Sequence, residues 1–280
     1  MTQVDTAPAR EVRHTAPIWR QWNLIWNFAQ RDLKSKFKGS ALGWAWSLVV
    51  PLATLGVYTI VFSVVFRGSP PDFGNGDTGI FVIWLFAGLT AWSFFSSTIN
   101  SGISGLIGTG ALLKKIYFPA YAPVLGSTVA QAVQSGIEFA LYLLVLLFVG
   151  NVGVSWLLAP VVVVLLVVFS ASLATALAIL NVHVRDLAHL VSVALQLLFY
   201  ATPIIYTLDF VPEDFHGIPM RTIVEWTPTG LFVEILRDVT YGLTAGPWQA
   251  WAGLAGWTAL ALGLAVLVFR RRGGDLGEEL

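Results

Sequence analysis

Long uncharged apolar runs are the feature that most constrains how this chain folds. Backbone amides in hydrocarbon must be hydrogen bonded within the chain, and a helix needs about 20 apolar residues to cross a bilayer. Of the 280 residues, 56% are hydrophobic and only 11% are charged, against about 25% charged in soluble proteins. We therefore predict an all-α integral membrane protein with six transmembrane helices, at residues 41–66, 80–98, 122–149, 156–180, 187–208 and 248–269.

The distribution of basic residues predicts the orientation of these six spans. An even number of spans places both termini on one side, and that side collects thirteen of the 16 Lys and Arg residues. Only Arg67, Arg221 and Arg237 fall on the other side. Because cytoplasmic loops are enriched in Lys and Arg, both termini are predicted to be cytoplasmic. The chain then divides into a cytoplasmic segment (1–40), a transmembrane domain (41–269) and a cytoplasmic tail (270–280).

Composition and motifs exclude several classes of function. A formal net charge of zero argues against nucleic acid as a partner, and the absence of cysteine excludes disulfides and thiolate chemistry. None of the four histidines has H-E-x-x-H spacing, so no metal site is expected. The chain also lacks the G-x-x-x-x-G-K-[ST] phosphate loop. No repeat relates its two halves, which argues against carriers built from inverted repeats. A channel or transporter subunit remains the leading class.

The segment before the first span has the pattern of an amphipathic helix. Apolar residues recur there at steps of three or four, and polar or basic residues fill the opposite face. A helix rich in Trp and Lys/Arg is typical of the headgroup plane of a membrane. Membrane anchoring alone explains this pattern, and docking of a cytoplasmic partner is the alternative. The apolar residues are Trp19, Trp22, Trp26, Ala29, Leu33 and Phe37.

The connections between spans suggest three further short elements. A polar, glycine-rich stretch after the second span precedes a short cytoplasmic helix that we expect to stop at Pro119. The next cytoplasmic connection, around Arg185 and Asp186, is equally brief, and both are either simple turns or contacts for a partner. Pro203 interrupts the fifth span near its outer end. Between it and the last span we predict short re-entrant or interfacial helices, which include the apolar-periodic residues 230–237.

The third span carries a polar stripe. An acid near the middle of the bilayer costs roughly 2.5–3.5 kcal/mol on insertion scales, so Glu138 must face protein or water. One interpretation is a seam of hydrogen bonds between helices, and the other is a polar wall of a translocation path. The stripe consists of Ser127, Gln131, Gln134, Ser135, Glu138 and Tyr142.

Four separated motifs resemble those of one transporter family. Residues 31–46 read RDLKSKFKGSALGWAW and are followed by Pro51 and Leu52. Residues 114–119 (KKIYFP), Asn181 with 185–187 (RDL), and 202–206 (TPIIY) follow in order. Together they resemble the ABC-2 type permeases that export polysaccharides, the Wzm-like subunits for O-antigen, teichoic acid and lipid-linked galactan. Thr227 precedes Pro228 where the family usually has Asn.

The resemblance implies an ABC-2 type exporter fold and a half-transporter without enzymatic activity of its own. Two copies of the chain would form a homodimer in the plasma (inner) membrane, and two copies of a separate ATPase would bind ATP and Mg beneath it. This assembly would move a lipid-linked polysaccharide from the cytoplasm to the outer side. The implied docking residues for the ATPase are Arg31, Asp32, Lys114, Lys115, Tyr117, Phe118, Arg185 and Asp186.

Aromatic residues complete the candidate substrate path, because their flat apolar faces suit the C–H faces of sugar rings. Trp44, Trp46 and Tyr58 on the first span and Phe199, Tyr200 and Tyr206 on the fifth lie on helices that the resemblance places along the path. Gln131, Gln134 and Glu138 would supply its polar side. Packing, or anchoring at the membrane interface, is the alternative role for each aromatic residue. A permease for a drug or small lipid, and a membrane enzyme acting on lipid-linked sugars, are the competing functions.

Overall fold

The protein is mainly helical in the part of the chain that the computed structural model describes, namely residues 21–36, 38–39, 42–65, 70–113 and 118–273. These ranges contain no β-strand, only one isolated bridge between Phe215 and Ile218, which confirms the all-α prediction. The α-helices are α1 (Trp22–Lys36), α2 (Trp46–Thr59), α3 (Phe81–Gly108), α4 (Gly110–Leu113), α5 (Tyr121–Val149), α6 (Ala159–His183), α7 (Leu187–Ala201), α8 (Met220–Glu225), α9 (Pro228–Thr240) and α10 (Trp248–Arg272).

Four helical segments in these ranges are long and apolar enough to cross a membrane by themselves. They are α3, α5, α10 and the segment Val154–His183, in which the 3₁₀ turn Val154–Leu158 leads into α6. Two shorter apolar helices, Trp46–Phe62 and Leu187–Ala201, occupy the positions of the first and fifth predicted spans. The chain is therefore a multi-pass membrane protein, with six apolar helices at the six predicted positions.

Helix α3 lies at the centre of the bundle and is longer than the predicted span 80–98. It continues without a break to Gly108, through the polar, glycine-rich stretch. Ser96 and Ser104 donate to carbonyls of the preceding turn, so their hydroxyls are satisfied inside the helix. Gly102 lets α3 approach Ala174 of α6 closely. The expected short cytoplasmic helix is described only as α4, because residues 114–117 lie outside the described part.

Helix α7 is shorter than predicted, because it ends at Ala201 and not at residue 208. Pro203 disfavours helical backbone at the residue before it, and Thr202 is accordingly extended. At the other end of the helix, the Asn181 side chain accepts a hydrogen bond from the backbone N–H of Ala188, at 2.7 Å. This bond fixes the turn between α6 and α7.

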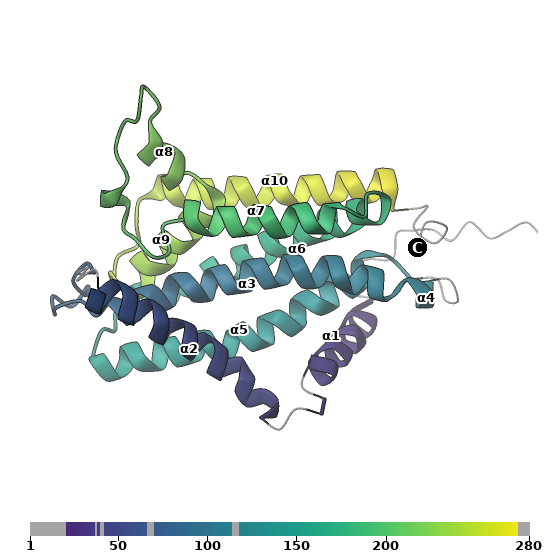
Figure 1. The fold of residues 1–280 in the computed structure, drawn as a ribbon, viewed down its shortest axis with the longest axis horizontal. Helices are drawn as coiled ribbons and strands as arrows, with labels where there is room; N and C mark the ends of the chain where they lie inside the picture. Colours follow the sequence, from purple (N-terminus) through teal and green to yellow (C-terminus); the bar gives the residue numbers. More distant parts are fainter. Residues whose placement is uncertain (1–20, 37, 40–41, 66–69, 114–117, 274–280) are drawn as a thin grey trace, which may run out of the picture.

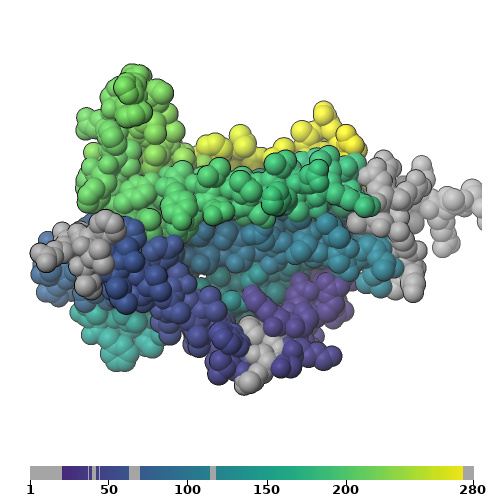
Figure 2. Space-filling view, viewed as in Figure 1, coloured from purple at the N-terminus to yellow at the C-terminus, as the bar shows by residue number. Residues whose placement is uncertain are grey.

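Helices α8 and α9 are the predicted short helices before the last span. With 13 residues, α9 is about 20 Å long and too short to cross the bilayer. Thr227 caps it, since its Oγ1 accepts a hydrogen bond from the Gly230 N–H, and Pro228 occupies the first turn. Helix α9 buries an apolar face against α3, α6 and α10, whereas Figures 1 and 2 show α8 projecting from the body of the molecule.

Helix α1 packs on the start of α5 with a face that differs from the predicted one. Ile25, Phe28 and Ala29 are buried, whereas Trp22 and Trp26 stack on each other at 6.4 Å and remain exposed. The helix therefore has two apolar stripes. One packs on α5, and the other stays exposed on the surface of the bundle. Of the predicted stripe, Trp19 and Phe37 lie outside the described residues.

The helices run along the long axis of the molecule, so the connections gather at its two ends (Figure 1). One end holds α4, the turn between α6 and α7, and the last residues of α10. The opposite end holds α8, α9 and the connection between α2 and α3. Helix α2 crosses the others obliquely and diverges from α3 and α5 toward its own N-terminus (Figure 1).

Candidate translocation path and docking surface

Polar residues of α1, α3 and α5 meet at the end of the molecule that holds α4. Lys36 donates from Nζ to the Oε1 atoms of Gln131 and Gln134. Gln131 in turn donates from Nε2 to Ser101 Oγ, at 2.6 Å. Partial burial lowers the pKa of Lys36, while the charge of Glu138 acts in the opposite direction. The predicted polar stripe of α5 therefore contacts both α1, which we call the interface helix, and the central helix α3.

A polar pocket of about 390 Å³ lies at this meeting point. It is lined by residues predicted for the docking surface, Arg31 and Asp32, and by residues predicted for the path, Gln131 and Gln134. Arg31 and Asp32 form an ion pair at 3.0 Å. Hydroxyl, amide and cationic groups at one pocket suit a hydrated ligand rich in oxygen atoms. The structure thus brings together two groups of residues that were predicted for different roles.

The C-terminal part of the polar stripe, from Glu138 onward, is buried. Glu138 is only 4% exposed and is hydrogen bonded to Gln134. One turn further along, the Tyr142 hydroxyl lies 2.8 Å from Thr240 Oγ1 of α9. The Tyr142 contact joins α5 to α9, as in a seam between helices, whereas the Glu138 contact stays within α5. The polar pocket is lined by the part of the stripe before Glu138.

The predicted aromatic residues gather between α2 and α7. The ring centroids of Tyr58 and Phe199 lie 6.2 Å apart, and those of Phe199 and Tyr200 lie 5.3 Å apart. The Tyr206 hydroxyl donates to the Tyr200 carbonyl at 3.1 Å. Tyr200 is 60% exposed and can meet a ligand directly. Trp46 is also exposed but lies at the other end of α2, and the side chain of Trp44 lies outside the described part.

Apart from Arg31 and Asp32 at the polar pocket, the predicted docking residues fall into three groups. Arg185 and Asp186 are exposed in the turn between α6 and α7, where a partner can reach them. Phe118 is buried instead, with its ring 5.3 Å from that of Phe28 on α1, so it anchors the interface helix. Lys114, Lys115 and Tyr117 lie outside the described residues.

Sequence reasoning missed the role of Arg237 and treated it only as an outer charge. The residue is 3% exposed, and its guanidinium lies 3.5 Å from the centre of the Trp84 ring. It donates to the carbonyls of Pro203 and Ile204, both at 2.6 Å, and to Glu234 Oε1 at 2.9 Å. These two carbonyls follow the break at the end of α7, and unpaired backbone is costly at membrane depth. The signal in the sequence that could have revealed this role is a basic residue inside the apolar-periodic stretch 230–237.

The fold and these sites define a class of protein: a multi-pass membrane protein with a polar pocket between α1, α3 and α5, an aromatic cluster between α2 and α7, and no phosphate loop in its sequence. The sequence profile of the ABC-2 type transporter family matches residues 23–241. The chain belongs to the ABC-2 type transporter family, which confirms the predicted resemblance.

Relatives of known role match most of the chain. It is 33% identical over 208 residues to the O-antigen export system permease protein RfbA of Myxococcus xanthus, covering 72% of this chain and 75% of that protein. It is 29% identical over 224 residues to an RfbA of Klebsiella pneumoniae, covering 78% and 80%. It is 21% identical over 250 residues to the polysialic acid transport protein KpsM of Escherichia coli, covering 86% and 90%.

Proposed function

We propose that this chain is the transmembrane permease subunit of an ATP-driven exporter, and that two copies form the route for a lipid-linked polysaccharide out of the cytoplasm. The observation that carries the proposal is the match to export permeases along more than 70% of the chain. Their substrates, O-antigen and polysialic acid by name, are polymers of sugars. The aromatic cluster between α2 and α7, in which Tyr200 is exposed, is suited to such a substrate, because sugar rings pack on aromatic faces.

A separate ATPase supplies the energy in this proposal. The chain has no phosphate loop, so nucleotide binding must come from a partner. Both termini face the cytoplasm, as the distribution of Lys and Arg indicates. The ATPase then docks at the end of the molecule that holds α4 and the exposed Arg185–Asp186 turn, beside α1.

Reconstitution tests the proposal directly. The chain is purified alone and together with a partner ABC ATPase, and both samples are tested in vesicles for ATP-dependent transfer of a lipid-linked polysaccharide. We expect transfer only with the ATPase, and a native mass that corresponds to two permease chains. Transport by an isolated monomer would contradict the assembly. Nucleotide-independent conversion of a lipid-linked sugar would identify a membrane enzyme, and export of a drug without polymer would identify a different permease.

Reversing two basic residues at the docking surface should uncouple the complex. We expect Lys114→Glu with Lys115→Glu to lower ATP-driven export roughly tenfold, equivalent to about 1.4 kcal/mol, because like charges replace complementary ones at an interface. Membrane insertion should be unchanged. Export of surface polymer is measured beside the amount of inserted chain, and Arg221→Glu at the opposite end is the matched control. Normal export by the double variant would show that these lysines serve only as a topology signal.

Single aromatic substitutions along the path should have modest effects. A moving polymer needs many weak contacts and no tight one, as in conduction through channels. We expect Trp46→Ala, Tyr58→Ala, Tyr200→Ala or Tyr206→Ala each to slow export about two- to threefold. Tyr200→Phe keeps the ring and should stay near the parental rate. Parental rates for all four alanine variants would remove the space between α2 and α7 from the path.

A further inference from the structure

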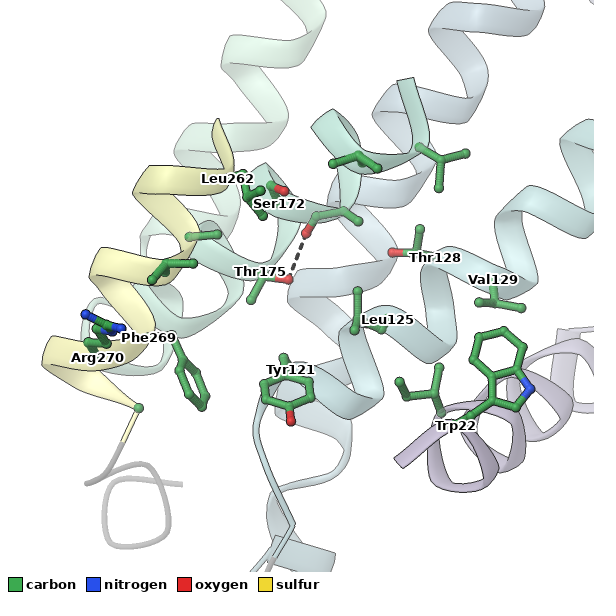
Figure 3. Close-up of a pocket in the computed structure, with 17 residues that line it drawn as sticks. Trp22, Tyr121, Leu125, Thr128, Val129, Ser172, Thr175, Leu262, Phe269 and Arg270 are labelled. Atoms are coloured by element: carbon green, nitrogen blue, oxygen red, sulfur yellow. Dashed lines mark hydrogen bonds between the residues drawn. The ribbon is translucent and has the colours of Figure 1, made fainter. Parts of the chain in front are cut away.

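A large groove lies between α1, α5, α6 and α10, and it shares no lining residue with the polar pocket described above. Its volume is about 850 Å³, and most of its wall is apolar, with Leu125, Val129 and Leu262 among the lining residues. Figure 3 shows α10 on one side of the groove and Trp22 of α1 on the other, with Tyr121 between them. Neither α2 nor α7 contributes a lining residue, so the groove is separate from the aromatic route.

The length of the groove matches one leaflet of a membrane. Along α10 it extends from Leu262 to Gly273, a rise of about 18 Å, and half of a typical hydrocarbon core is about 15 Å. On α5 it begins at Tyr121, the first residue of that helix. Both helices have these residues at the end that the proposed orientation places in the cytoplasm. A groove of this depth accepts an acyl chain from the cytoplasmic leaflet.

The charge at the mouth of the groove selects the headgroup. Arg270 is the only charged side chain among the lining residues that the structure describes, and Arg271 and Arg272 follow it on the last turn of α10. A guanidinium binds phosphate oxygens with two parallel hydrogen bonds. Trp22 is 52% exposed on the opposite rim, and Trp is enriched at the depth of lipid headgroups.

We propose that this groove binds one anionic glycerophospholipid of the cytoplasmic leaflet, with its phosphate at Arg270 and an acyl chain along the wall formed by α5, α6 and α10. The bound lipid contacts both α1 and α10, and so steadies the interface helix on the bundle. The proposal rests on the orientation given under the proposed function. It concerns a resident membrane lipid and not the exported one, because the groove lies apart from α2 and α7.

Native mass spectrometry of the purified permease, with and without its ATPase, tests this proposal. The protein is exchanged into micelles that contain phosphatidylglycerol or phosphatidylcholine, and the lipids retained per permease chain are counted. We expect preferential retention of phosphatidylglycerol. Arg270→Gln should lower that retention about fivefold, whereas Arg271→Gln, which does not line the groove, should lower it less than twofold. Equal retention of the two lipids, or equal effects of the two substitutions, would overturn the proposal.

A second pair of variants tests the acyl-chain site without changing charge. Val266 lines the groove and is half exposed, whereas Leu264 is exposed on the same helix outside the groove. We expect Val266→Trp to fill the groove and abolish retention of phosphatidylglycerol, and Leu264→Trp to leave it unchanged. Retention by Val266→Trp at the parental level would exclude the groove as the site. The count of bound lipid does not depend on export, so it separates failure of this proposal from failure of the proposed function.

Discussion

Replacing Arg237 by methionine is expected to destabilise the fold by about 3–5 kcal/mol, the usual cost of removing one member of a buried ion pair. Methionine fills similar space but donates no hydrogen bond. The carbonyls of Pro203 and Ile204 lose their donor, and Glu234 loses its counterion. Arg237→Lys should recover little, because one ammonium cannot match the geometry of a planar guanidinium that reaches two carbonyls and a carboxylate together.

The measurement is the thermal midpoint and the monodisperse fraction of the detergent-purified chain. Arg221→Met is the matched control, because Arg221 pairs with Asp209 on the exposed side of the same region and exposed pairs contribute little. A thermal midpoint for Arg237→Met within a degree or two of the parent would show that the break after α7 is stable without this residue.

Substitution of Gly126 is expected to detach the interface helix from the bundle. A Cβ atom at this position would lie 2.4 Å from Phe28 Cβ and 3.0 Å from the Ile25 carbonyl oxygen. These atoms belong to the backbone of α1 or are fixed to it, so the clash with Gly126→Val is relieved only if α1 moves. If α1 is part of the docking surface, ATP-driven export should fall more than about tenfold. This corresponds to a loss of more than about 1.4 kcal/mol in the free energy of coupling between ATPase and permease.

Chemical labelling can follow this detachment, because the chain contains no native cysteine. Ala29 is fully buried on the face of α1 that packs on α5, so Ala29→Cys should resist a water-soluble maleimide in the parent and react in the Gly126→Val background. Gly136→Val is the control on the same helix, since no atom lies within 4 Å of a Cβ at that position. Full protection of Ala29→Cys in both backgrounds would mean that α1 accommodates the larger side chain in place.

Hydropathy predicted where the helices lie, because burial in lipid depends on composition over about 20 residues. It predicted their ends less well. The serine and glycine residues at 96–105 look unsuited to lipid, yet they continue α3, because that helix is covered by α5 and α6. Proline at 203 was recognised as an interruption, but the apolar residues after it extended the predicted span to 208, whereas the helix stops at Ala201.

The candidate sites were predictable to the extent that they follow from helical periodicity. Steps of three and four residues placed Gln131, Gln134 and Glu138 on one face of α5, and Lys36 now contacts that face. The network of Arg237 depends on contacts distant in sequence, 153 residues away for the Trp84 carbonyl. No local pattern indicates such a partner, so only the unusual position of a cation in an apolar stretch signalled it.

The early end of α7 has a consequence for the surrounding bilayer. Its 15 residues measure about 22 Å, roughly 8 Å less than a typical hydrocarbon core. Such a hydrophobic mismatch is met by local thinning of the bilayer or by protein that covers the difference. Helix α9 packs on α3 at this depth, and Arg237 holds the two chain segments together. If the proposed path runs beside α7, the distance that a polar chain travels there is shorter than the thickness of the membrane around it.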